Sequence, residues 1–197
     1  PEKMGDLAQK NSQRPILKIK LSGDGDLERL QAIRKYAPET RLVVDANEAW
    51  TPEHFNRYVP ELMQLGVEMI EQPFPADYDS VLKTLDHPIP ICADESCHDT
   101  ADLDRLVGLY EFVNIKLDKT GGLTEALHLQ AAAEDKGFLT MIGCMSATSL
   151  GIAPAFLIAQ RAKIIDLDAP LYLYDDRAFP MKYDGSIVHP PSPELWG

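Results

Sequence analysis

Short apolar, β-branched runs recur along the chain, and each of the first six is followed by a segment with helical periodicity or helix signals. This order of strand then helix, repeated along the chain, predicts an α/β fold with a parallel sheet. The runs are ILKIKL (16–21), RLVVDA (41–46), VEMIEQ (67–72), PICADE (90–95), FVNIKL (112–117), FLTMIG (138–143) and KIIDLD (163–168).

The segments between these runs carry helix signals of their own. LERLQAIRKYA (27–37) has the periodicity of an amphipathic helix. HFNRYVPELMQLG ends at Gly66, and the helix expected from about Leu123 to Lys136 is followed by Gly137. Both glycines suit the position just after a helix, where a left-handed backbone is common.

A polar residue stands near the end of most of the runs, and the first five of these residues are separated by 22 to 26 positions. One βα unit of a TIM barrel averages about 30 residues, so the spacing is compact but compatible. In such a barrel the strand ends converge on one mouth, whereas a doubly wound sheet gathers ligands at a switch point. The pattern therefore predicts a TIM-type (β/α) barrel. The residues are Lys20, Asp45, Glu71, Asp94, Lys116 and Asp166.

Seven such units are visible where a barrel needs eight, and the chain opens with Pro1 rather than Met. We therefore expect the first strand to precede this sequence. A chain of 197 residues with 45% hydrophobic residues is long enough to bury a sizeable core. Residues 1–197 are expected to form a single domain, a partial catalytic barrel.

Three of the strand-end residues are acids from consecutive strands: Asp45, Glu71 and Asp94. Each alone suits a solvated strand end, but three carboxylates brought together repel one another unless a cation joins them. Ligation by oxygen atoms alone suits a hard ion. The regular spacing therefore predicts a Mg²⁺ site.

Lys20 and Lys116 fall on strands that flank the acidic strands in sequence, and in a barrel these strands would face one another. Two amines so placed suit proton removal from one face of a substrate and its return to the other. Lys18 shares a strand face with Lys20, because side chains alternate along a strand. It would make Lys20 a better base, or bind an anionic substrate group or a neighbouring acid.

Asp166 and Asp168 share one face of the last run and would attract a cationic substrate group, although such a pair is as often a turn or a solvated strand end. Gly121 and Gly122 would cradle an anion at a helix N-terminus or serve a tight turn. The five histidines follow no ligand spacing and are expected to be structural, and Cys144 lacks a partner histidine in sequence.

Charge and cysteine content exclude several classes of protein. The formal net charge of −12 argues against a nucleic-acid partner, which needs clustered Lys and Arg. No apolar stretch is long enough for a membrane span, and no signal-peptide pattern is present. Three cysteines without paired CxxC spacing fit reduced thiols, so we expect a cytoplasmic protein.

The same motifs resemble the enolase superfamily, in its muconate-lactonizing-like branch, and most closely the bacterial dipeptide epimerases of the L-Ala-D/L-Glu epimerase type. The resemblance runs over nearly all of residues 15 to 175. It rests on KIK (18–20), VVDAN (43–47), EQP (71–73), CADES (92–96), NIKLDKTGG (114–122), IGCM (142–145) and DLD (166–168).

The resemblance implies a two-base 1,1-proton transfer at the α-carbon of the C-terminal residue of L-Ala-L-Glu or L-Ala-D-Glu, in murein peptide recycling. The substrate carboxylate would bind Mg²⁺ held by Asp45, Glu71 and Asp94, which stabilises an enediolate intermediate. Lys20 and Lys116 would be the acid/base residues. Asp166 and Asp168 would hold the dipeptide's α-ammonium group, and Lys18 would assist at the carboxylate.

Two departures from the family pattern concern specificity. Many members carry a glutamate where this chain has Ala147, which leaves the side-chain preference open. Members also carry an N-terminal α+β capping domain that reads the substrate side chain, and this sequence shows no counterpart. The expected partners are a small dipeptide and a second copy of the chain in a homo-oligomer.

Two other functions stay open at this point. The same lysines and metal would serve muconate cycloisomerisation or succinylbenzoate synthesis, but those substrates have no α-ammonium group for Asp166 and Asp168. Alternatively, the chain is a non-catalytic barrel fragment with a structural or binding role.

Overall fold

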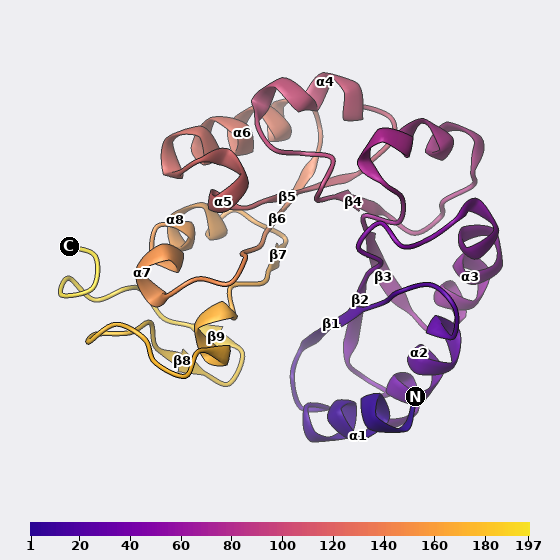
Figure 1. Ribbon diagram of the computed structural model, residues 1–197, viewed down its shortest axis with the longest axis horizontal. Coiled ribbons are helices and arrows are strands. Elements are labelled where there is room, and N and C mark those ends of the chain that lie inside the picture. The colour runs from indigo at the N-terminus through magenta and orange to yellow at the C-terminus, as the bar shows by residue number, and fades with distance from the viewer. The chain divides into compact units, whose positions relative to one another are not determined.

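The computed structural model describes residues 1–197, which divide into two compact units, Pro1–Ser96 and Cys97–Gly197. Each unit combines parallel strands with helices that follow them in the chain, as Figure 1 shows by element labels.

The first unit contains four parallel strands that neighbour one another in chain order. Lys20 is in register with Asp45, and Asp45 is in register with Glu71, which in turn lies opposite Cys92. The carboxyl ends of the strands are therefore aligned, and the residues that end them lie side by side. The strands are β1 (Ile16–Lys20), β2 (Arg41–Asp45), β3 (Val67–Glu71) and β4 (Ile91–Ala93).

Local sequence explains where the helices of this unit begin and end. Thr51 and His54 form a capping box at the start of α3, where Pro52 occupies the first helical position. Gly66 follows the helix with φ of +67°, the left-handed backbone expected there. The elements are α1 (Glu2–Lys10), α2 (Asp26–Tyr36), α3 (Pro52–Gln64) and the 3₁₀ helix η1 (Ala76–Thr84).

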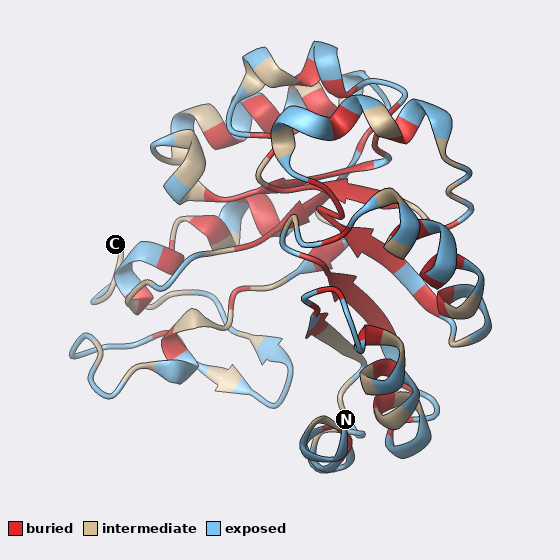
Figure 2. Cartoon of the chain, turned by 45° about the vertical axis from the view of Figure 1, so that its right-hand side comes forward, coloured by how far each residue is buried: buried red, intermediate tan, exposed pale blue.

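The strands form the core, and Figure 2 shows β2, β3 and β4 mostly in the buried colour, with the exposed colour on the outward faces of the helices. Strand β1 is less covered, since only Ile19 of its five residues is buried. Consecutive β2 residues Leu42, Val43 and Val44 are all fully buried. Burial of both faces is the pattern of a strand in a covered parallel sheet. This explains the continuous apolar runs in the sequence.

The second unit contains three parallel strands, also in chain order, and a short antiparallel hairpin near the C-terminus. The strands are β5 (Phe112–Ile115), β6 (Leu139–Ile142) and β7 (Ile164–Ile165), and the hairpin is β8 (Tyr183–Asp184) and β9 (Ile187–Val188). The helices are η2 (Thr100–Asp102), α4 (Leu103–Leu106), α5 (Leu117–Thr120), α6 (Leu123–Asp135), α7 (Ser149–Ile152), α8 (Ala155–Ala159) and η3 (Ala169–Tyr172). None of the helices has the length and hydropathy that a bilayer crossing requires.

All seven expected strands are confirmed, and each ends one to three residues before the run in the sequence does. Two expectations are corrected. The segment after β3 is the 3₁₀ helix η1, and β7 ends at Ile165, so Asp166 and Asp168 lie in the turn after the strand and not on its face. Aspartate side chains offer the backbone local hydrogen bonds that compete with the sheet ladder, and counting of alternate residues misses this. The sequence patterns did not predict helix α1 or the hairpin of β8 and β9.

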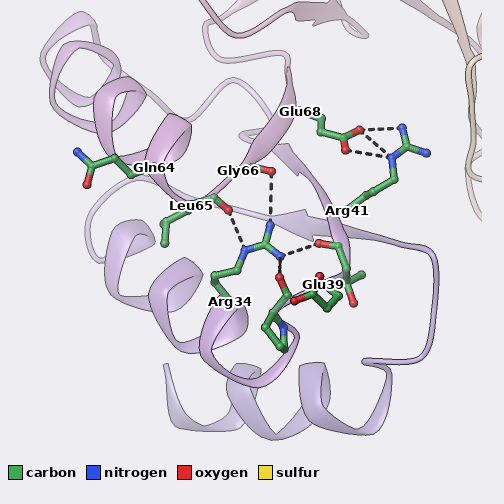
Figure 3. Close-up of a pocket in the computed structure, with 9 residues that line it drawn as sticks. Arg34, Glu39, Arg41, Gln64, Leu65, Gly66 and Glu68 are labelled. Carbon is green, nitrogen blue, oxygen red and sulfur yellow. Dashed lines mark hydrogen bonds and ion pairs between the residues drawn. The ribbon is translucent and has the colours of Figure 1, made fainter.

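A cavity of about 380 Å³ lies at the amino ends of β2 and β3, the opposite ends from Asp45 and Glu71 (Figure 3). Its central side chain is Arg34, whose guanidinium donates to the carbonyl oxygens of Leu65 at 2.8 Å and Thr40 at 2.7 Å. Because these donors are occupied by backbone carbonyls, Arg34 links helix ends to strand starts and does not form an anion site.

Candidate functional site

Two lysines of β1 bind the same carboxylate at the carboxyl end of the strands. Lys20 Nζ lies 2.5 Å from Asp45 Oδ2, and Lys18 Nζ lies 3.0 Å from the same atom. This confirms that the two lysines share one face of β1. Their exposure differs, because the Lys18 side chain is 17% exposed and that of Lys20 is 61% exposed. Lys20 is therefore the ammonium group that reaches solvent.

The Asp45 carboxylate is fully buried and has partners on both oxygens. Oδ2 accepts from the two lysines, and Oδ1 accepts from the backbone N–H of Asn47 at 3.0 Å. Asn47 and Glu48 adopt left-handed backbone conformations, with φ of 44° and 63°. This strained turn after β2 aims a backbone donor at the acid and fixes its orientation.

Glu71 ends β3 and is also fully buried. Its Oε2 lies 2.7 Å from Lys18 Nζ, so Lys18 joins the ends of β2 and β3. Burial raises the pKa of Glu71 to about 7; Lys18 opposes this rise, while Asp45 and Asp94 add to it. The negative charges of Asp45 and Asp94 disfavour ionisation of Glu71, as expected for neighbouring carboxylates. Lys18 thus binds neighbouring acids, one of the alternatives that the sequence left open.

Asp94 follows β4 and is held through its backbone. Its N–H donates to Gln72 Oε1 at 2.8 Å, and Ser96 N–H donates to the same oxygen at 3.1 Å. Gln72 Nε2 donates in turn to Phe74 O at 2.9 Å and to Ser96 Oγ at 2.8 Å, and Ser96 Oγ donates to Asp79 at 2.9 Å. The buried Gln72 amide therefore connects the turn after β3 to the turn that carries Asp94.

The donor chemistry of this cluster fits a hard cation. Asp45, Glu71 and Asp94 are at most 2% exposed, and carboxylate oxygens are the ligands that Mg²⁺ prefers. Oxygens of Asp45 and Glu71 already converge on one positive charge, the Lys18 ammonium. No group of three or more His, Cys, Asp and Glu side chains is spaced to hold a metal ion in this structure.

Lys116 belongs to the second unit, where it follows β5 and precedes α5. The residue is 7% exposed, and its Nζ lies 3.8 Å from the sulfur of Met145. Gly143 of the IGCM motif packs against this strand: a Cβ atom there would lie 2.7 Å from Asn114 Oδ1. The motif glycine is therefore required by close packing beside β5, the strand that directly precedes Lys116.

Asp166 and Asp168 also belong to the second unit and lie in the turn between β7 and η3. Asp166 N–H donates to Ile142 O at 2.8 Å, which extends the ladder by one bond, and Asp168 Oδ2 accepts from the Tyr172 hydroxyl at 3.2 Å. Both acids are half-buried. The motif is thus an ordered turn with partly accessible carboxylates.

Other candidates are structural. The three cysteines are free, and burial raises the pKa of Cys144 to about 11, which disfavours a thiolate nucleophile. His54 caps α3 and stacks on Tyr58. Gly121 and Gly122 have φ of 75° and 141°, so the turn between α5 and α6 requires glycine.

Sequence reasoning missed the polar residues that hold the acid-bearing turns in place. Gln72 and Ser96 lie within the EQP and CADES motifs, and Asp79 and Tyr183 lie outside every motif. A buried glutamine directly after a strand-end acid is the one signal that was readable. The roles of Asp79 and Tyr183 depend on contacts with residues 16 or more positions away in the chain.

The model of the family described as enolase C-terminal domain-like matches residues 3–192. The chain belongs to this family. The chain is 43% identical over 197 residues to an N-acetyl-D-glutamate racemase of a Pseudoalteromonas species, and this match covers 100% of this chain and 62% of that protein. It is 47% identical over 174 residues to the L-Ala-D/L-Glu epimerase of Escherichia coli strain K12, and this match covers 88% of this chain and 54% of that protein.

Solved structures agree with this family assignment. An enolase family member from Agrobacterium tumefaciens with homology to dipeptide epimerases, bound to sodium and L-Ala-L-Glu, is 50% identical with a TM-score of 0.95, over 98% of this chain and 59% of that one. A dipeptide epimerase from Enterococcus faecalis V583, complexed with Mg and L-Leu-L-Tyr, is 32% identical with a TM-score of 0.86, over 92% and 55%. The expected fold class, that of the enolase-superfamily barrel domain, is confirmed.

Proposed function

We propose that the protein containing this chain is a Mg²⁺-dependent dipeptide epimerase that inverts the α-carbon of the C-terminal residue of L-Ala-L-Glu and L-Ala-D-Glu. The observation that carries the proposal is the cluster at the strand ends, where two lysine ammonium groups lie within 3.0 Å of one buried carboxylate oxygen. The chain spans 62% and 54% of the lengths of the two curated relatives, so the activity is proposed for the whole protein.

Proton removal requires catalysis because the α-proton of an amino acid residue is weakly acidic. Asp45, Glu71 and Asp94 would hold Mg²⁺, which when bound supplies positive charge to the substrate carboxylate and so makes the α-proton easier to remove. Burial of all three acids strengthens their attraction for a divalent cation, since the surrounding dielectric is low. The relatives solved with Mg support the choice of ion.

Inversion needs one group to remove the α-proton and another to deliver a proton to the opposite face. Lys20, as the neutral amine, takes the proton from one epimer, and Lys116, as the ammonium ion, gives a proton back to the carbon. The roles exchange for the other epimer, so each turnover leaves one lysine protonated and the other neutral. Lys20 is exposed and Lys116 is buried, so the two amines start from different environments.

Asp166 and Asp168 are proposed to bind the free α-ammonium group of the dipeptide. Their half-buried carboxylates in an ordered turn support this role. Lys18 is proposed to assist at the carboxylate end, because it already neutralises two of the acids there.

A second candidate follows from the relative named N-acetyl-D-glutamate racemase, which matches the whole chain at 43% identity. Ala-Glu and N-acetylglutamate are both N-acylated glutamates, so the same lysines and metal would serve either. They differ in the α-ammonium group, which only the dipeptide carries. The acidic pair Asp166 and Asp168 favours the dipeptide.

The two candidates are separated by presenting L-Ala-L-Glu, N-acetyl-L-glutamate and N-acetyl-D-glutamate to the protein with Mg²⁺ and following inversion by chiral chromatography. We expect kcat/KM for the dipeptide to exceed that for either acetylated compound by tenfold or more, about the value of one charged hydrogen bond. Faster inversion of the acetylated compounds would identify a racemase. Inversion of none of them would favour cycloisomerisation, succinylbenzoate synthesis or a non-catalytic barrel.

The biological setting is proposed on similar grounds. Free thiols on all three cysteines support a cytoplasmic location, and an enzyme that accepts L-Ala-D-Glu would consume a product of murein peptide hydrolysis. A homo-oligomer and the order of domains in the whole protein stay predictions.

A further inference from the structure

We propose that Tyr183 is a positioning residue for substrate specificity: with Cys144, it fixes the turn Asp166–Asp168 and thereby sets the affinity for substrates with a free α-ammonium group. The inference rests on the proposed function, because it concerns the two acids assigned there to the ammonium group. Tyr183 would not touch the substrate. It would act through the backbone of Leu167.

The backbone of this turn is held at every carbonyl. The Cys144 thiol donates to Asp166 O at 3.3 Å, and the Tyr183 hydroxyl donates to Leu167 O at 2.7 Å. The third carbonyl, of Asp168, accepts from Leu171 N–H at 2.9 Å and opens η3. Two of the three anchors are therefore side chains from other parts of the second unit.

The Leu167 side chain fixes the same turn from the other direction. It is 2% exposed, while Asp166 and Asp168 on either side are half-buried. With the leucine side chain in the core and its carbonyl held by Tyr183, rotation about the Leu167 backbone is restricted. Both flanking carboxylates then keep their directions, which is what recognition of an ammonium group by two acids requires.

Tyr183 is itself held by the C-terminal hairpin. It pairs with Val188 across β8 and β9, and Met181, two residues earlier, is buried and donates its N–H to Ser149 Oγ at 2.8 Å. The phenol is half-buried, which strengthens its hydrogen bond relative to one in water. In this proposal the hairpin positions the Tyr183 hydroxyl against the turn.

The test compares two substrates that differ only in the ammonium group: L-Ala-L-Glu and N-propionyl-L-glutamate, in which hydrogen replaces the amine. The variant is Tyr183→Phe, which removes the hydroxyl and keeps the ring. Tyr174→Phe is the matched control, because Tyr174 is fully exposed on the same segment. KM and kcat are measured for both substrates, and thermal melting reports folding of each variant.

We expect Tyr183→Phe to raise KM for the dipeptide about three- to tenfold, the range for loss of one hydrogen bond, with kcat within about twofold. KM for the propionyl compound should not change, and Tyr174→Phe should match the wild type. An equal rise for both substrates, or no rise for either, would overturn the proposal. If Tyr183→Phe does not fold, Cys144→Ala gives the same decision, because it removes the donor to Asp166.

The wild-type comparison separates failure of this inference from failure of the proposed function. A wild-type protein that does not prefer the free amine would refute the role of the two acids, and the inference would fall with it. A wild-type preference that survives Tyr183→Phe and Cys144→Ala would refute the positioning role alone.

Discussion

The ammonium nitrogen of Lys18 lies 2.7 Å from Oε2 of Glu71, with side chains that are 17% and 0% exposed. This buried ion pair joins β1 to the end of β3, and its lysine also contacts Asp45 on β2. Removal of one partner from a buried pair leaves the other charge without compensation, which costs more than the pair itself contributes.

Lys18→Met should therefore lower the free energy of unfolding by about 3 kcal/mol, because two buried acids lose a shared cation. Urea denaturation followed by circular dichroism measures this. Lys10→Met, at an exposed position in α1, is the control and should stay within about 0.5 kcal/mol of wild type. A Lys18→Met protein as stable as this control would show that the ion pair contributes nothing.

Lys20→Ala and Lys116→Ala should each reduce epimerisation by about a thousandfold, since each removes one of the two proposed acid/base groups. Each variant keeps the other lysine, so one of them should still exchange the α-proton of a single epimer with D₂O. NMR of the substrate in D₂O measures both effects, with Lys3→Ala as an exposed control. Full epimerisation by either variant would remove that lysine from the mechanism.

The strands and the residues at their ends could be predicted because two local signals agree. Apolar runs such as that of β2, which contains Leu42, Val43 and Val44, indicate buried strands, and parallel strands in register align their ends. The spacing of Lys20, Asp45 and Glu71 then follows from the size of one βα unit. The apolar runs can be recognised from a few neighbouring residues, and the spacing of the strand ends from the length of one βα unit.

What could not be predicted depends on contacts between distant residues. Tyr183 binds Leu167 across 16 positions, and Ser96 binds Asp79 across 17. The sequence predicts that Asp166 and Asp168 share a strand face, because alternation continues through them, yet strand β7 ends at Ile165. Cys144 and Tyr183 donate hydrogen bonds to the backbone of this turn, and no local pattern reveals these contacts.

Gln72→Leu should destabilise the protein by about 3 kcal/mol, because the buried amide makes four hydrogen bonds and its loss leaves the N–H groups of Asp94 and Ser96 without their acceptor. Guanidinium titration measures the change. Gln64→Leu, at an exposed position in α3, should change stability by at most about 0.5 kcal/mol. Equal stability of the two variants would contradict the role assigned to the amide.

Asp176 should stabilise the second unit in a pH-dependent way. Burial acts to raise the pKa of Asp176, but hydrogen bonds from the Ser149 hydroxyl and N–H outweigh it, so the pKa is lowered. A lowered carboxyl pKa stabilises the fold above the unfolded value and loses that effect as pH falls through the folded value. Asp176→Asn should cost about 1 kcal/mol at pH 7, as for loss of a helix cap, and little at pH 2. A cost independent of pH in thermal melts would contradict this.

The most direct test of the central claim is ¹H NMR of L-Ala-L-Glu incubated with the protein in D₂O, with Mg²⁺ and with EDTA. We predict loss of the Glu α-proton signal and appearance of L-Ala-D-Glu when Mg²⁺ is present, and neither change with EDTA. Exchange at the same rate without the metal, or no exchange under either condition, would contradict a Mg²⁺-dependent epimerase.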